Sequence, residues 1–207
     1  MKNTLAYIIL LIVAAGCSNI KEPKTIAIQT LSGFPNDLKD TIRQSIEDYY
    51  HFETVIYNDI KIPEEYYTAF KSPRYRADSI IRFLKLNKAD SIDYIVGLTT
   101  KDICITKYDE DGKIKSPASK YRDWGIFGLG YRPGASCVVS IKRLKHANRT
   151  KYIDRIKKVT LHELGHNLGL PHCENQHCFM RDAAETIKTI DDVELNLCDK
   201  CFNKVQQ

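Results

Sequence analysis

The chain has 207 residues, of which 43% are hydrophobic and 28% are charged, and its formal net charge is only +5. This length is enough for one domain with a buried core. The basic residues are spread along the chain, so we do not expect nucleic acid as a partner. We expect the protein to be a monomer. We interpret pairs such as Lys157-Lys158 and Lys142-Arg143 as solvated faces of amphipathic elements.

The N-terminal segment is typical of an export signal rather than of a folded domain. An apolar run over residues 5–13 follows Lys2, and it is far shorter than the roughly 20 residues that span a bilayer. The segment "AAGC" that ends at Cys17 resembles a bacterial lipobox, which implies lipidation of Cys17 and cleavage before it. An ordinary signal peptide is the alternative. We therefore expect an exported bacterial lipoprotein, anchored to the membrane in the periplasm or at the cell surface. The predicted divisions are a lipoprotein-type signal peptide over 1–16, a tether over 17–23 and one compact domain over 24–207.

The domain begins with alternating strand-like and helix-like segments. Helices are indicated where apolar residues recur three or four positions apart, as Leu38, Ile42 and Ile46 do. In chain order we predict a strand over 24–31, a helix over 36–51, a strand over 53–62, a helix over 74–86 and a strand over 91–99. Tyrosine pairs at 49–50 and 66–67 are expected to pack helices rather than bind substrate. This order favours an α/β (α+β) fold with a mixed twisted sheet.

The second half of the chain contains short strand candidates and one long helix. The strand candidates lie over 102–108, 126–132 and 136–144, and the turn-rich segment over 109–125 is predicted to be a surface loop. A final helix is predicted from about Thr150 through Leu168. The apolar residues that could bury one side of it are Ile153, Ile156, Val159, Leu161, Leu164 and Leu168.

The end of that helix carries the sequence "LHELGHNLGLPHC", over residues 161–173. His162 and His166 are four positions apart, so on a helix they share a face and can hold one zinc ion. Glu163 lies between them and can take a proton from a zinc-bound water without being a ligand itself.

The residues after the helix predict a turn that brings a third ligand to the metal. Gly169 is suited to the left-handed conformation of a helix end, and Pro171 prevents the helix from continuing. The chain can then bring His172 to the zinc. Three protein ligands leave the fourth position open, as in catalytic zinc sites.

Cysteines form a second constellation. Two pairs follow the third histidine, and they are Cys173, Cys178, Cys198 and Cys201. Their spacing fits a structural zinc with four thiolate ligands, which would fasten the loop after His172 to the C-terminal segment. Two disulfides are the alternative in an exported protein. His177 could replace one cysteine, although a solvated position suits it better. Cys104 and Cys137 lie in strand-like segments, where buried free thiols are expected and a disulfide is the alternative.

Residues 162–201 read H-E-x-x-H-x-x-G-x-x-H-C-x₄-C-x-M-x₁₇-C-x₂-C, and in this they resemble the archaemetzincins, a metzincin family of zinc peptidases. The resemblance implies a metzincin-like fold with an active-site helix, and two zinc ions, one catalytic and one structural. It assigns Glu163 as general base and Met180 as the methionine of the turn beneath the metal. Weaker similarity extends upstream over 72–84, 93–103 and 127–144. The implied ligands are His162, His166 and His172 for the catalytic zinc, and Cys173, Cys178, Cys198 and Cys201 for the structural zinc.

The function predicted from these residues is zinc-dependent hydrolysis of peptide bonds, with Glu163 as general base. By resemblance, the substrate would lie extended along an edge strand within 124–139. Candidates for stabilising the oxyanion, by residue type alone, are Tyr121, Tyr131 and Arg132. One alternative is a lipid-anchored zinc protein that binds a peptide or protein without turnover. Another is a zinc amidase that acts on a cell-wall amide. Endopeptidase and aminopeptidase activity are equally compatible with the sequence.

Overall fold

The computed structural model describes residues 23–183 and 186–206. The predicted signal peptide, Cys17 and the tether as far as residue 22 lie outside the described residues. Among the described helices, none combines the length and the apolar character needed to cross a membrane.

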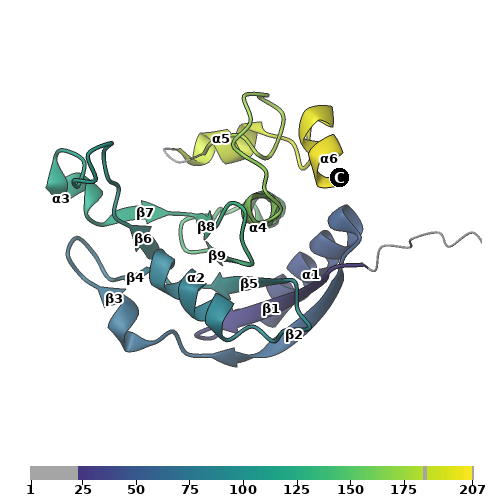
Figure 1. Cartoon of the computed structure of the whole chain (residues 1–207), viewed down its shortest axis with the longest axis horizontal. Helices are drawn as coiled ribbons and strands as arrows, with labels where there is room; N and C mark the ends of the chain where they lie inside the picture. The colour runs from purple at the N-terminus through teal and green to yellow at the C-terminus, as the bar shows by residue number, and fades with distance from the viewer. Residues whose placement is uncertain (1–22, 184–185, 207) are drawn as a thin grey trace, which may run out of the picture.

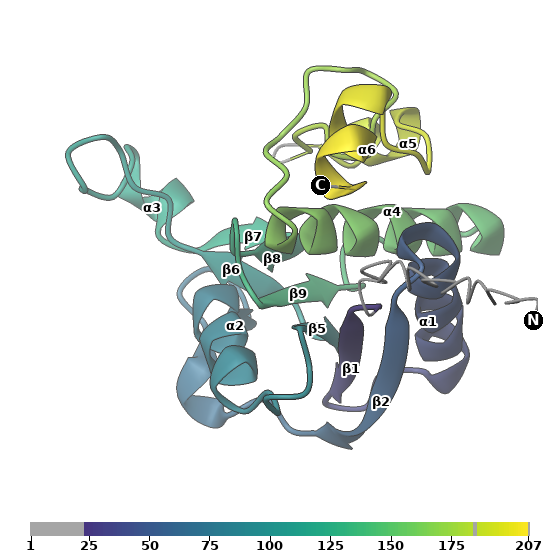
Figure 2. The same ribbon diagram turned by 45° about the vertical axis from the view of Figure 1, so that its right-hand side comes forward.

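The main sheet has five strands in the order β2-β1-β5-β9-β8. Four of them are parallel, and the edge strand β8 runs antiparallel to β9, which confirms the predicted mixed sheet. The helices α1 and α4 pack on one face of this sheet and α2 packs on the other (Figures 1 and 2). The bounds are Thr25–Leu31 for β1, Asn36–Tyr50 for α1, Glu53–Ile60 for β2, Ala77–Leu86 for α2, Tyr94–Thr99 for β5, Gly128–Gly130 for β8, Ser136–Ser140 for β9 and Arg149–Asn167 for α4.

The alternation of residues along β1 divides the core into two clusters. Ile26 and Ile28 pack with α1 and α4, whereas Ala27 and Leu31 pack with α2 on the opposite face. Successive side chains of a strand point to opposite faces, so helices on both faces bury nearly all of β1. The edge strand β2 is largely exposed by comparison.

A second, four-stranded sheet has the order β3-β4-β6-β7 and extends into an arm that carries α3 (Figure 1). Two predictions need correction here. The helix predicted over 74–86 begins only at Ala77, because the first three residues pair as β4 with β3 and β6. The loop predicted over 109–125 contains α3 and the start of β7. The bounds are Glu64–Tyr66 for a 3-10 turn, Tyr67–Thr68 for β3, Arg74–Arg76 for β4, Ile103–Ile105 for β6, Ala118–Tyr121 for α3 and Trp124–Ile126 for β7.

Helix α4 begins after Asn148, whose side chain accepts a hydrogen bond of 3.0 Å from the backbone N–H of Lys151. Two short helices that the sequence did not predict, α5 (Ile187–Asp192) and α6 (Asp199–Gln206), lie on the side of α4 away from the sheet (Figure 2). Helix α4 is therefore covered on two sides, and it carries the metal-binding motif between the sheet and this C-terminal lobe.

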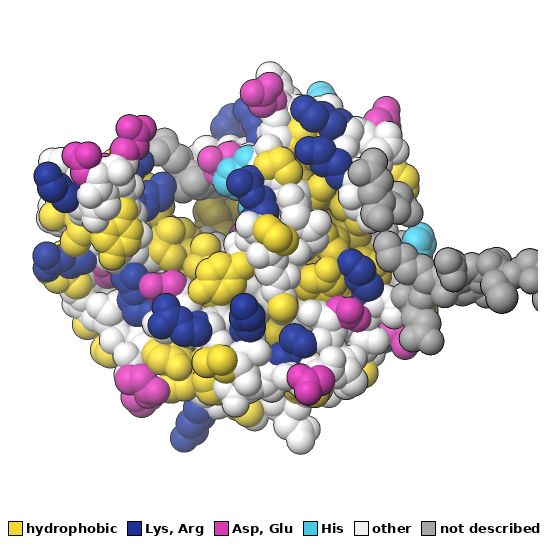
Figure 3. Space-filling view, viewed as in Figure 1, with side chains coloured by type: hydrophobic (Ala, Val, Ile, Leu, Met, Phe, Trp, Pro, Cys, Tyr) yellow, Lys and Arg dark blue, Asp and Glu magenta, His cyan; other side chains and the backbone are white. Residues whose placement is uncertain are grey.

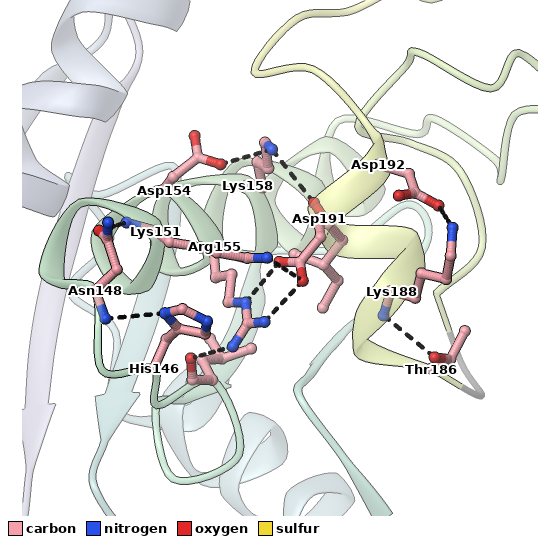
Figure 4. A network of polar contacts seen from close by, with 12 residues as sticks. His146, Asn148, Lys151, Asp154, Arg155, Lys158, Thr186, Lys188, Asp191 and Asp192 are labelled. Carbon is pink, nitrogen blue, oxygen red and sulfur yellow. Dashed lines mark hydrogen bonds and ion pairs between the residues drawn. The ribbon is translucent and has the colours of Figure 1, made fainter.

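Charged residues of α4 are buried under α5, and the expectation that Lys158 is solvated was wrong. Lys158 is only 6% exposed, because its ammonium group contacts Asp154 at 2.6 Å and donates to the carbonyl of Ile190 at 3.3 Å. Arg155 donates to both carboxylate oxygens of Asp191, at 2.6 and 2.7 Å (Figure 4). The Arg155 guanidinium lowers the pKa of Asp191 to about 2. These contacts hold α5 against α4.

Candidate metal centre

Three histidine side chains converge at the C-terminal end of α4. One ring nitrogen from each of His162, His166 and His172 lies within 4.8 Å of the others. The Nδ1 atom of His162 is 2.7 Å from the carbonyl oxygen of Phe179, and that of His166 is 2.8 Å from the carbonyl oxygen of Leu170. A carbonyl can only accept, so each Nδ1 carries the proton and each Nε2 is free to bind a metal.

The turn that brings in His172 has the predicted geometry. Helix α4 ends at Asn167, and Gly169 adopts a left-handed conformation with φ +93°. The backbone N–H of Leu170 returns to the carbonyl of Gly165 at 2.9 Å, which closes the helix end. His172 is about half exposed, and its Nδ1 lies 3.6 Å from Asp182, a residue that the sequence did not mark as part of the site. The motif therefore folds as the spacing of Gly169 and Pro171 predicted.

Burial sets the protonation of the residues at the centre. Burial lowers the pKa of His162 to about 3, so its imidazole is neutral and able to bind a metal. Burial raises the pKa of Glu163 to about 8, although a hydrogen bond from the backbone of Gly130 acts in the opposite direction. Glu163 does not belong to the histidine cluster, so it is placed as a neighbour of the ligands.

Two glycines of β8, which the sequence did not mark as site residues, allow this strand to touch α4. A Cβ atom at Gly128 would lie 2.6 Å from the side chain of Glu163, and one at Gly130 would lie 2.6 Å from its carbonyl oxygen. Alternate residues of a strand share a face, so "GLG" presents both glycines to the helix. In the sequence, the two glycines at alternate positions of a strand were the available signal of a close contact. Only the folded structure shows that the contact is with Glu163 of α4.

Met180 is fully buried beneath α4. Its sulfur would lie 2.6 Å from a Cβ atom at Gly165, so glycine is needed between His162 and His166 for this approach. The hydroxyl of Tyr50 donates to the carbonyl of Leu161 at 2.9 Å on the same side of the helix. The expectation that the tyrosine pair at 49–50 packs helices is confirmed at Tyr50.

A cavity of about 360 Å³ opens beside the histidines. Figure 3 shows it as a hollow with hydrophobic side chains inside, between the arm that carries α3 and the lobe that carries α5. Arg132 lines this cavity together with Glu163 and the β8 backbone. Tyr121 instead stacks on Trp124 in the arm, with ring centroids 5.3 Å apart. Of the three oxyanion candidates named from the sequence, Arg132 is the one among the lining residues.

The four cysteines predicted as a second metal site also come together. One sulfur atom from each of Cys173, Cys178, Cys198 and Cys201 lies within 4.8 Å of the others. The sulfur atoms of Cys173 and Cys198 are 3.6 Å apart, far beyond the roughly 2.05 Å of a disulfide, and all four are free. His177 lies outside the cluster, 3.2 Å from Glu194.

Cys104 and Cys137, for which the sequence left a free thiol and a disulfide open, are buried free thiols. Cys104 belongs to β6 of the small sheet and Cys137 to β9 of the main sheet. Burial raises the pKa of the Cys104 thiol to about 12. Neither residue contributes to the metal centre.

Comparison with known proteins identifies the family. The family model described as peptidase family M54 matches residues 25–207. The chain belongs to peptidase family M54. The archaemetzincin of Halobacterium salinarum is 30% identical over 189 residues, which cover 87% of this chain and 98% of that relative. The chain is therefore a zinc metallopeptidase, and the family resemblance seen in its sequence is confirmed.

Solved structures of archaemetzincins have a similar fold. A crystal structure of archaemetzincin from Methanopyrus kandleri aligns with a TM-score of 0.72 and 23% identity, covering 91% of this chain and 97% of that chain. The archaemetzincin of Archaeoglobus fulgidus, crystallised with malonate, aligns with a TM-score of 0.69 and 26% identity, covering 87% and 99%. These similarities confirm the predicted fold class.

Proposed function

We propose that this M54 metallopeptidase cleaves peptide bonds at a zinc ion held by His162, His166 and His172, with Glu163 as general base. The donor set fits zinc, since three imidazoles converge, two of them with a free Nε2 atom, and together they leave a fourth position open. Bound zinc would polarise the substrate carbonyl and lower the pKa of a water molecule to about 7. The charge of a bound zinc ion would favour the ionised form of Glu163, against the effect of its burial. The Glu163 carboxylate would then accept a proton from that water and pass it to the leaving amine.

The position of Glu163 carries this proposal. Its side chain is buried beside the histidine cluster, lines the same cavity and receives a backbone hydrogen bond from Gly130. A purely structural zinc site has no use for a carboxylate that neighbours the ligands without joining them. The arrangement therefore favours an enzyme over a protein that binds peptides without turnover.

The edge strand β8 supports an extended binding mode for the substrate. It pairs with β9 on one side and ends the sheet on the other, and its glycines line the cavity. A peptide could add to this edge through main-chain hydrogen bonds. We assign Arg132 as the side chain that stabilises the developing oxyanion, because it lines the cavity near the histidines.

We further propose a second, structural zinc bound by Cys173, Cys178, Cys198 and Cys201. Four free sulfur atoms within 4.8 Å of one another support it, since thiolates so placed repel without a cation between them. The ion would tie the segment after His172 to the start of α6. It would thereby hold the third catalytic ligand in place.

The export and lipidation of the chain remain a proposal from the sequence of residues 1–17. Lipidation of Cys17 would place the peptidase on a membrane, in the periplasm or at the cell surface, where it would meet exported peptides or proteins. A Cys17→Ser variant should then move from the membrane fraction to the soluble fraction after cell breakage. If the wild type and the variant divided equally between the membrane and soluble fractions, the proposed lipid anchor would be wrong.

The catalytic proposal is tested with Glu163→Gln, which keeps the shape of the side chain and removes the base. We expect hydrolysis of a fluorogenic peptide library to fall by about 10²–10⁴-fold while the zinc content stays unchanged. Glu110→Gln, in an exposed loop, makes the same chemical change as a control and should keep full activity. Full activity of zinc-loaded Glu163→Gln would refute the mechanism. Cleavage of cell-wall amides but of no peptide would favour the amidase alternative.

A further inference from the structure

A second cavity, of about 570 Å³, lies at the carboxyl ends of β5 and β9 and shares no lining residue with the metal cavity. Its wall is built from the segments that follow β5 and β9. The residues from these segments are Thr100, Lys101, Asp102, Ile141, Lys142 and Lys145.

The cavity occupies a place in the sheet where α/β proteins bind ligands. From β1 the chain passes through α1 to β2 on one side, and β5 pairs with β1 on the other side. Helices α1 and α2 cover opposite faces of the sheet. The topological switch point therefore lies between β1 and β5, and Pro35, which follows β1, lines the cavity together with the residues that follow β5. Crevices at the carboxyl ends of parallel strands at such points hold ligands in many open sheets. The metal centre lies instead at β8 and α4, so the switch point has no part in the proposed peptidase.

Lys101 and Lys142 follow the ends of two neighbouring strands and line this cavity. Thr99 pairs with Ser140 in the parallel ladder, so Lys101 and Lys142 each lie two residues beyond the same register point on neighbouring strands. The backbone N–H of Lys101 donates to Thr99 Oγ1 at 3.1 Å, and that of Lys142 donates to Ser140 Oγ at 3.2 Å. Buried hydroxyl groups thus hold both lysines at the rim.

The positive charge of the rim is not compensated from within the described residues. No ion pair joins Lys101, Lys142 or Lys145 to any described carboxylate. Asp102 is the acidic residue of the wall, but Arg143 Nε donates to its Oδ1 at 2.6 Å and Arg74 Nε to its Oδ2 at 2.9 Å. Positive charges that line one cavity without carboxylate partners favour the binding of an anion there.

Aromatic rings complete the wall. Tyr67 is 45% exposed and meets Tyr75 edge to face, with ring centroids 5.5 Å apart. Tyr152, from the first turn of α4, lines the same cavity. Exposed tyrosine rings offer a surface on which a planar ring can stack. We propose that this cavity is a second ligand site, for a nucleoside phosphate whose phosphates contact the lysines and whose base contacts the tyrosines.

The test is a titration of the zinc-loaded, ¹⁵N-labelled protein with ADP and with inorganic pyrophosphate, followed by NMR. Both probes should shift the backbone amide signals of residues 100–102 and 141–145. A triple variant, Lys101→Ala with Lys142→Ala and Lys145→Ala, should bind both probes at least tenfold more weakly. The control replaces Lys61, Lys85 and Lys113 with alanine, which removes the same charge from exposed positions elsewhere and should change affinity less than twofold.

A further variant, Tyr67→Ala, distinguishes the contribution of the tyrosine ring to ligand binding from that of the lysines. It should weaken ADP binding several-fold and leave pyrophosphate binding unchanged. The proposal is overturned if neither probe shifts these amides, or if the shifts are confined to Gly128 and Gly130, which would indicate binding at the zinc. Equal weakening in both triple variants would also overturn it, because the effect would then be one of net charge. Thermal melting of each variant shows that the fold is intact.

Discussion

The contact between β8 and α4 predicts the effect of a single methyl group on catalysis. In a Gly130→Ala variant the new Cβ atom would lie 2.6 Å from the carbonyl oxygen of Glu163, whereas ordinary contact begins at 3.4 Å. The obstacle is backbone, so no side-chain rotation relieves it. The strand must retreat by about 0.8 Å, the difference between these two distances. Its hydrogen bond to the Glu163 carboxylate lengthens with it.

Two measurable consequences follow from that displacement. Overpacking of this kind costs about 1–3 kcal/mol of stability, measurable by urea denaturation. A misplacement near 1 Å at a reacting group can reduce the rate by about 10²-fold, so we expect kcat/KM for a peptide substrate to fall by that order with zinc retained.

A matched variant separates catalysis from stability. Ile95→Val, in the centre of the sheet on the face that packs with α2, should lose about 1 kcal/mol and keep its activity. If zinc-loaded Gly130→Ala hydrolysed peptides as fast as the wild type, the approach of β8 to Glu163 would not set the catalytic geometry, and the reasoning would be wrong.

Three further predictions concern stability. Arg155, with a smaller contribution from Lys151, depresses the folded-state pKa of Asp191 from 3.8 to about 2, so these contacts together contribute about 2 kcal/mol above pH 5 that is lost as the pH falls toward 2. Urea denaturation should therefore show that Asp191→Asn is less stable than the wild type at pH 7, and the difference in the free energy of unfolding should disappear in acid. A difference that does not depend on pH would show that the ionised Asp191 carboxylate is not its cause. Tyr50→Phe should lose about 1 kcal/mol with activity unchanged, since it removes one buried hydrogen bond to Leu161, and an unchanged denaturation midpoint would show that this bond is not needed. EDTA should lower the melting temperature of the wild type more than that of Cys198→Ser, which already lacks the structural zinc, and equal decreases would argue against the cysteine site.

The ligand residues could be predicted because their geometry is local. His162 and His166 lie one helical turn apart, and Gly169 with Pro171 fixes the turn that follows, so the spacing alone predicts convergence. The structure then brings His172 to within 4.8 Å of the other two. The order of the first strands and helices was predictable for a similar reason, since periodicity and turn residues are properties of short segments.

Other features depend on partners that are distant in sequence. Lys158 looked like part of a solvated pair, but it is covered in part by α5, a helix of six residues whose pattern is too short to be recognised. Gly130 has no functional group that would mark it as a site residue. It matters because β8 approaches the backbone of Glu163 at this position. Arg74, Asp102 and Arg143 come from three separate segments, so no local pattern shows that Asp102 is already neutralised.

The most direct test of the two-metal account is the zinc content of the purified protein, measured by elemental mass spectrometry without added metal or chelator. We expect two zinc ions per chain in the wild type, and one in both Cys198→Ser and His166→Ala. The ion that His166→Ala retains should be the structural one, so its melting temperature should stay close to that of the wild type while its activity is lost. One zinc or none in the wild type would contradict the account, because the two ligand clusters would not both be metal sites.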